Sequence, residues 1–127
     1  MKFSQRVHVH SDSRGDIYDL ISGDLVSAVS LVTFTPNAVR GNHIHHETSQ
    51  WNYVVYGRLT VVTEFDGVQS TKEFTHGDLF LIPPAEAHAM KASEATELMV
   101  FTLGPRAGKD FEKDTIRLAT PLIDHVG

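Results

Sequence analysis

The chain lacks cysteine, long apolar runs and clusters of basic residues, and each absence excludes a class of protein. None of its 127 residues is cysteine, so the sequence contains neither a disulfide nor a thiolate metal site and is compatible with a reducing compartment. No run approaches the roughly 20 apolar residues that span a bilayer, and the first residues lack the apolar centre of a secretion signal. We therefore expect a cytoplasmic protein without membrane contact. The formal net charge of -5, with no Lys or Arg block, argues against a nucleic-acid surface.

The sequence also lacks a sustained helical period and any break in composition that would mark a second domain. Instead, about eight to ten short apolar or alternating segments are separated by turn residues, which is typical of an all-β protein. The clearest pair is Leu59–Glu64 and Val68–Phe74, which flank the hairpin signal Asp66-Gly67. We predict one domain in which the strands close into a jelly-roll β-barrel over about residues 12–103, followed by a tail from 104 to 127.

Two further segments bear on how the barrel is covered. Leu25–Phe34 is apolar on both faces, as expected for a strand that is buried on both sides. Because the chain shows no amphipathic helix to cover the outer face, we expect a second subunit to do so in a symmetric homodimer. In the tail, Phe111, Ile116 and Leu118 are expected to anchor the segment to the barrel. The charges of Lys109–Arg117 are expected to face solvent.

The functional candidates concentrate between Val39 and Gly57. His43 and His45 are two positions apart on a predicted strand, so their imidazoles share a face at a spacing of about 7 Å along the backbone. If the polar residues that follow form a hairpin, Gln50 lies opposite His45 and can offer an amide oxygen. His88 follows a buried strand and a proline pair, and supplies a further ligand candidate. Three imidazoles at one place predict a site that holds a metal ion or flanks a ligand.

Other histidines have simpler interpretations. His8 and His10 repeat the two-residue spacing, but they share a strand face with Ser4 and Arg6, so we expect them to be exposed to solvent or at a substrate mouth. His76 precedes a glycine in a turn, and we expect it to be exposed.

The spacing of these residues resembles the two motifs of the cupin superfamily, G-x5-H-x-H-x4-E-x6-G and G-x5-P-x-G-x2-H-x3-N. The positions that match are His43, His45, Gly57, Gly77, Pro83 and His88. The positions that depart are Asn37, Gln50, Ala85 and Ala92. Asn37 is a mild change because asparagine tolerates left-handed backbone. The resemblance implies a double-stranded β-helix barrel with His43, His45, Gln50 and His88 as the metal-ligand set.

Three imidazoles and an amide oxygen suit Zn, Fe, Ni, Mn or Cu as a divalent ion. Because no carboxylate is present, the ion keeps its full charge in this ligand set. Weaker binding and stronger polarisation of a bound oxygen are the expected consequences. We predict that replacement of Gln50 by glutamate tightens metal binding.

The stretch RGNHIHHETSQ has a closer resemblance, to the dTDP-4-keto-6-deoxyhexose 3,4-ketoisomerases. In that family the histidines transfer protons beside a ketone without a metal, so the resemblance implies that His43 and His45 are the catalytic pair. It also implies that Arg40 meets a phosphate or sugar oxygen. The alternative for Arg40 is a position at the barrel rim, paired with Glu47 or solvent.

Three functions remain open on the sequence alone. The first is a metal-binding cupin that isomerises or epimerises a small polar or sugar-like substrate. The second is a three-histidine iron dioxygenase. The third is a non-catalytic small-molecule-binding module. In each case the expected partner is a small molecule, with Arg40, Asn52, Tyr56 and Met90 as candidate binding residues.

Overall fold

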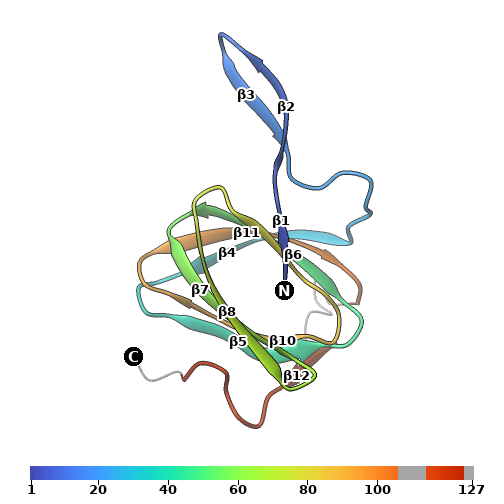
Figure 1. Ribbon diagram of the computed structural model, residues 1–127, viewed down its shortest axis with the longest axis vertical. Coiled ribbons are helices and arrows are strands. Elements are labelled where there is room, and N and C mark those ends of the chain that lie inside the picture. The colour runs from blue at the N-terminus through green and yellow to red at the C-terminus, as the bar shows by residue number, and fades with distance from the viewer. Residues whose placement is uncertain (106–113, 125–127) are drawn as a thin grey trace.

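The computed structural model describes residues 1–105 and 114–124, and all strand pairings within them are antiparallel. Two five-stranded sheets form the barrel, and a separate two-stranded hairpin projects away from it (Figure 1). In the described ranges, no helix is long and apolar enough to cross a membrane. The fold is the all-β jelly roll that the sequence predicts.

The first sheet has the order β1 (Lys2–Ser4), β9 (Leu79–Ile82), β6 (Ser49–Tyr56), β11 (Thr96–Leu103) and β4 (Ala28–Phe34). The second sheet has the order β12 (Thr115–Arg117), β5 (Val39–His45), β10 (Ala87–Ala92), β7 (Arg58–Phe65) and β8 (Val68–Thr75). From β4 onward, consecutive strands alternate between the two sheets, except for the hairpin β7–β8, which lies within one sheet. The projecting hairpin pairs β2 (Val7–Asp12) with β3 (Gly15–Asp19). The space between the sheets therefore collects side chains from distant segments.

Apolar side chains fill much of this space. Phe74 and Phe80 stack with ring centroids 4.2 Å apart, and both are fully buried. Burial of a side chain of this size stabilises the fold by about 1.5–3 kcal/mol. The core cluster continues through Met90 and Leu98, which also line the cavity described below. The core and the cavity are thus continuous.

The hairpin β7–β8 forms as predicted. Phe65 pairs with Val68, which leaves Asp66 and Gly67 as a two-residue turn. Both turn residues have positive φ, 52° and 75°. Two such residues define the type I′ turn that matches the right-handed twist of the paired strands.

The hairpin on which a position of Gln50 opposite His45 depends does not form between β5 and β6. β5 pairs with β10 and β12, whereas β6 pairs with β9 and β11. The residues that connect β5 to β6 carry the chain from one sheet to the other. Gln50 therefore approaches the histidines across the barrel and is not the cross-strand partner of His45.

Strand β4 begins at Ala28, and the described residues cover only one of its faces. Val32 and Phe34 point inward, while Val29 and Leu31 are 57% and 65% exposed. This single-sided burial differs from the both-sided burial expected for Leu25–Phe34. The outer face of β4 presents an apolar surface at the edge of its sheet.

The tail adds the strand β12 to the second sheet, beside β5. The expectation of solvent exposure is wrong for Asp114, which is only 8% exposed. The expectation that Ile116 anchors the tail is also wrong, because its side chain is exposed. Leu118 is half-buried, and its amide donates to the carbonyl of Asn42 at 2.9 Å. Phe111 lies outside the described residues.

Candidate functional site

Three imidazoles from two neighbouring strands converge between the sheets. His43 and His45 are on β5, and His88 lies opposite His43 on β10. The candidate ligand atoms of the three side chains all lie within 4.8 Å of one another. The ring of His43 is 4.6 Å from the ring of His45 and 4.6 Å from the ring of His88, centroid to centroid. The spacing of the three histidines in the sequence thus predicts their convergence correctly.

A close approach of two backbones produces this geometry. The pairing of β10 with β5 shifts register between His88 and Ala89, opposite Gly41. Gly41 has φ +94°, and a Cβ placed on it would lie 2.9 Å from the carbonyl oxygen of His88 and 3.1 Å from the Cα of Ala89. A side chain at position 41 would therefore push β10 away from β5. Glycine at this position brings His88 close to His43.

Backbone carbonyls orient two of the rings. Nδ1 of His45 lies 3.1 Å from the carbonyl oxygen of Asp114, and Nδ1 of His88 lies 3.5 Å from that of Glu86. A carbonyl oxygen only accepts hydrogen bonds, so Nδ1 of His45 carries a proton. In the neutral ring the lone pair is then on Nε2, which is the nitrogen available to an ion or a substrate proton.

Gln50 reaches the site from the opposite sheet. Its Nε2 donates to Oδ1 of Asn52 at 2.8 Å, so Oε1 is the atom of its amide that remains for a ligand. Asn52 is itself fixed, because its Nδ2 donates to the carbonyl oxygens of Gln50 and Phe80 at 3.2 and 3.4 Å. The orientation of the Gln50 amide is thus set by a buried neighbour.

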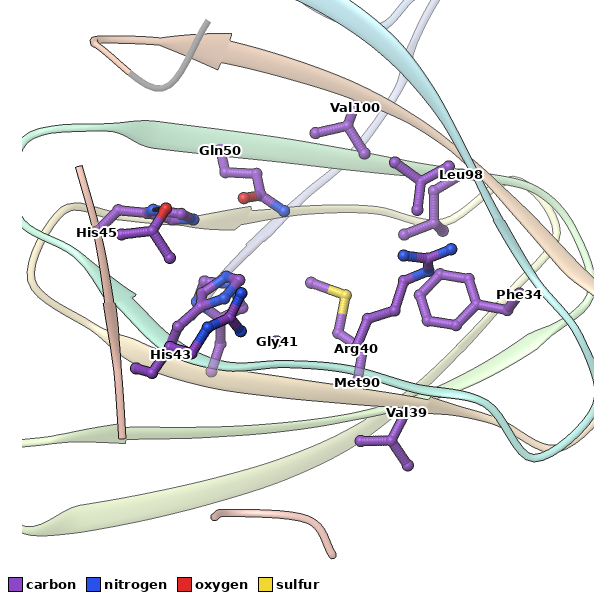
Figure 2. Close-up of a pocket in the computed structure, with 14 residues that line it drawn as sticks. Phe34, Val39, Arg40, Gly41, His43, His45, Gln50, Met90, Leu98 and Val100 are labelled. Atoms are coloured by element: carbon purple, nitrogen blue, oxygen red, sulfur yellow. Dashed lines mark hydrogen bonds between the residues drawn. The ribbon is translucent and has the colours of Figure 1, made fainter. Parts of the chain in front are cut away.

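These groups form the polar part of a cavity of about 360 Å³ (Figure 2). The polar lining residues are Arg40, His43, His45, Gln50, His88, Thr115 and Arg117. The apolar lining residues are Val32, Phe34, Val39, Met90, Leu98 and Val100. Figure 2 shows the labelled histidines and Gln50 at one end, and Phe34 and Leu98 at the other. A cavity of this size and mixed character is typical of a small-molecule site.

The motif spacing and the barrel agree with a comparison against protein families. The model of the family named Cupin matches residues 20–113. This chain belongs to the cupin family. No curated protein matches the sequence.

Solved structures similar to this cupin include enzymes that modify sugars. QdtA, a sugar 3,4-ketoisomerase from Thermoanaerobacterium thermosaccharolyticum in complex with TDP, has a TM-score of 0.74 and 19% identity, over 92% of this chain and 87% of its own. A 3,4-ketoisomerase from Helicobacter canadensis has a TM-score of 0.75 and 17% identity, over 91% and 89%. dTDP-4-dehydrorhamnose 3,5-epimerase from Sulfolobus tokodaii has a TM-score of 0.66 and 19% identity, over 78% and 68%. At these identities the likeness shows the fold.

Two residues that depart from the cupin motifs adopt a left-handed backbone conformation. Asn37 and Ala85 replace motif glycines, and both have φ +68°. Asparagine adopts this conformation readily, as predicted, whereas alanine does so at a cost of about 1–2 kcal/mol. The amide of Ala85 donates to the carbonyl of His45 at 2.7 Å. The strained residue Ala85 is therefore hydrogen-bonded to a residue of the histidine centre.

The candidate binding residues fall into two groups. Arg40 and Met90 line the cavity of this cupin. Arg40 donates to the carbonyl oxygen of Thr33 at 3.1 and 2.9 Å, and this carbonyl, in place of Glu47, is the partner that the described residues supply.

Asn52 and Tyr56 do not belong to the cavity wall. Asn52 is buried behind Gln50, and Tyr56 is exposed at the end of β6.

The remaining histidines lie where expected. His8, His10 and His76 are exposed. His8 pairs with Asp16 and His10 with Asp12 on the projecting hairpin. The hydrogen bond with His8 is the main reason that the pKa of Asp16 is lowered, and the hydrogen bonds from Arg14 are the main reason that the pKa of Asp12 is lowered to about 2.

The sequence interpretation missed the contribution of the tail. Thr115 and Arg117 line the cavity, and Asp114 supports the connection between β5 and β6. Thr115 and Arg117 are two positions apart, which is the strand alternation that also identified His43 and His45. The charged residues before them hid this short alternating segment.

Proposed function

We propose that this cupin is an isomerase or epimerase of a small, sugar-like carbonyl compound that binds in the histidine-lined cavity. The convergence of three imidazoles within 4.8 Å carries the proposal. Across the described cavity wall, histidines are the only side chains whose ordinary pKa lies near neutrality. Movement of a proton beside a carbonyl needs such groups on both sides of the reacting atoms.

His43 and His45 are the proposed proton-transfer pair, with ring centroids 4.6 Å apart. One neutral imidazole removes the proton from the carbon next to the carbonyl, while a protonated imidazole donates to the carbonyl oxygen. In an isomerase the resulting enediol is reprotonated at the former carbonyl carbon, while the hydroxyl on the other carbon returns its proton to an imidazole and becomes the new carbonyl. In an epimerase the enediol is reprotonated on the opposite face of the same carbon, while the former carbonyl oxygen returns its proton. Electrons and protons balance without an oxidant. The carbonyl of Asp114 holds His45 with Nε2 as the transferring atom.

The similar structures support a nucleotide-linked keto sugar as the substrate class. Two are 3,4-ketoisomerases, one of them in complex with TDP, and a third is an epimerase of dTDP-4-dehydrorhamnose. Arg40 and Arg117 in the cavity wall supply the cationic groups that a diphosphate requires. The apolar end around Phe34 and Leu98 suits a deoxygenated carbon or a methyl group.

The same centre fits a divalent transition metal. His43, His45 and His88 would supply imidazole nitrogens, and Gln50 would supply Oε1. The carbonyl partner of Nδ1 in His45 is the kind of contact that orients metal-binding histidines. Zn, Fe, Ni, Mn and Cu all accept such ligands, and a bound ion would polarise a substrate oxygen as a Lewis acid.

Metal content separates the possible functions. An ion that occupies all three histidines removes the acid and base of the proposed reaction from the cavity wall. We therefore expect added zinc to inhibit proton exchange. Zinc-dependent exchange would instead support a metal-assisted isomerase. One equivalent of iron with substrate-dependent oxygen uptake would support the dioxygenase, and binding without turnover would support the non-catalytic module.

We also propose that this cupin forms a homodimer through the outer face of β4. Val29 and Leu31 are exposed there, and Val9 and Ile17 are exposed on the projecting hairpin. An isolated two-stranded hairpin is marginally stable in water, so contact with another subunit would stabilise the hairpin. The same contact would remove the apolar side chains on the outer face of β4 from water. In a twofold-symmetric dimer, the face of β4 and the hairpin of one subunit would meet the same two surfaces of the other subunit.

Deuterium exchange tests the proposed reaction. The protein is incubated in D2O with TDP-4-keto-6-deoxyglucose, and deuterium at the carbons beside the carbonyl is followed by mass spectrometry. We expect exchange in the natural protein and in His76→Asn, whose altered side chain is exposed and outside the cavity wall. His43→Asn and His45→Asn should each lose at least about 100-fold. Equal exchange rates in all four proteins would refute the proton-transfer role.

A further inference from the structure

The connection from β5 to β6 is held by a single buried carboxylate. Oδ1 of Asp114 accepts from the amide of His46 at 3.2 Å. Oδ2 accepts from the amides of Glu47 and Thr48, both at 2.9 Å, and from the hydroxyl of Thr48 at 2.8 Å. Three consecutive backbone amides of this loop thus donate to one side chain, and that side chain belongs to the tail.

The charge state of Asp114 suits this role. Burial raises the pKa of the carboxyl group, but the hydrogen bonds from Glu47, Thr48 and His46 together outweigh burial and hold the pKa below its usual value. The carboxylate is therefore ionised at neutral pH. Hydrogen bonds to an ionised acceptor are stronger than those between neutral groups.

The same residue also contacts the histidine centre through its backbone. Its carbonyl oxygen lies 3.1 Å from Nδ1 of His45, and Oγ1 of the next residue, Thr115, lies 3.3 Å from the same nitrogen. The side chain of Asp114 thus fixes the loop that follows His45, while its carbonyl fixes the ring. Displacement of Asp114 would disturb both at once.

The end of the loop at Thr48 packs closely against the residue that follows β11. Thr48 is buried, and a Cβ added to Gly104 would lie 2.7 Å from its Oγ1 and 2.8 Å from its Cα. Asn42 fixes the tail on the other side of β12, because its Oδ1 accepts from the amides of Leu122 and Ile123 at 2.8 and 3.1 Å. The loop is therefore fixed at Thr48, while His46 and Glu47 remain exposed.

We propose that Asp114 is a positioning residue that fixes the ring of His45 and the separation between His45 and Gln50. The loop held by its carboxylate is the link between these two residues, which approach the cavity from different sheets. The proposal deepens the proposed function, because both residues belong to that site. It assigns to the tail a part in building the site, in addition to the cavity-lining Thr115 and Arg117.

The test compares Asp114→Asn and Asp114→Ala with Asp124→Asn. Asp124 lies in the same tail and is exposed, so it provides the same chemical change away from the loop. Asparagine keeps one acceptor oxygen and alanine keeps none, so the effect should be graded. We expect kcat for proton exchange to fall about 10-fold in Asp114→Asn and about 100-fold in Asp114→Ala, with KM changed less than twofold. Asp124→Asn should match the natural protein.

A second readout does not depend on activity. In long-range 1H–15N spectra of histidine-labelled protein, the two ring nitrogens of neutral His45 report its tautomer. We expect only the Nδ1-protonated form in the natural protein and in Asp124→Asn, and a mixture of forms in Asp114→Ala. If Asp114→Ala does not fold, Asp114→Asn and Thr48→Val provide the weaker perturbations.

An unchanged His45 spectrum in the folded variants would overturn the positioning role, even if the proposed reaction is confirmed. A changed His45 spectrum in the Asp114 variants, together with no exchange activity in the natural protein, would support the positioning role and refute the proposed reaction.

Discussion

Replacement of Gly41 by alanine is the sharpest structural test of how the centre is assembled. The backbone at this position has φ +94°, which costs an L-residue about 1–2 kcal/mol. The added Cβ also meets backbone atoms of His88 and Ala89, at 2.9 and 3.1 Å. Because backbone atoms of a paired strand move only with the strand, this overpacking costs a further ~1–3 kcal/mol. Gly41→Ala should therefore lower the free energy of unfolding by about 2–5 kcal/mol.

Gly67→Ala is the matched control. Gly67 has φ +75°, and a Cβ placed on it meets no atom within 4 Å, so this variant carries the backbone cost alone. Urea unfolding followed by the fluorescence of Trp51, the single tryptophan, gives both free energies. The proteins should be compared at one concentration, because a dimer is stabilised by mass action. Equal destabilisation of the two variants would refute the contact between β5 and β10 that brings His88 to His43.

Four other predictions test the centre and its surroundings. Gln50→Glu should bind zinc at least about 10-fold more tightly in calorimetric titration, because it adds an anionic ligand; unchanged affinity would show that residue 50 does not coordinate. Leu31→Lys should shift the protein from dimer to monomer in sedimentation, whereas Val68→Lys, at an equally exposed apolar residue of the other sheet, should not. The pKa of Asp114 is lower in the folded protein than its unfolded value of 3.8, so its carboxylate stabilises the fold above that value. This contribution to the free energy of unfolding should be lost as pH falls from about 4 through the folded pKa. The dependence of the free energy of unfolding on pH in this range should be weaker in Asp114→Asn. Addition of TDP should raise the melting temperature, and no shift at millimolar concentration would count against a nucleotide-linked substrate.

The parts of the fold that local sequence predicts are those with local causes. Asp66-Gly67 specifies its own turn, since both residues adopt positive φ readily. His43 and His45 face the same way because of strand alternation. His88 adds a feature that alternation does not supply, the motif spacing of a known family. Together these features are enough to place three imidazoles in one cavity.

The errors share a non-local cause. A short polar connection is the same in sequence whether it turns back to the adjacent strand or crosses to the opposite sheet. Sequence therefore places Gln50 near the histidines but does not show that it arrives from the opposite sheet. The burial of Asp114 depends on backbone donors of His46, Glu47 and Thr48, which lie far earlier in the chain. Composition near Asp114 indicates a solvated segment, and only the fold brings its carboxylate to the loop.

Histidine-resolved zinc titration tests the central claim most directly. In 1H–15N spectra of histidine-labelled protein, the signals of His43, His45 and His88 should change together and be complete at one equivalent of zinc per chain. The exposed His76 should stay unchanged over the same range. A change at His43 and His45 that leaves His88 unaffected, or that requires a separate equivalent for His88, would contradict the shared centre on which the proposed function depends.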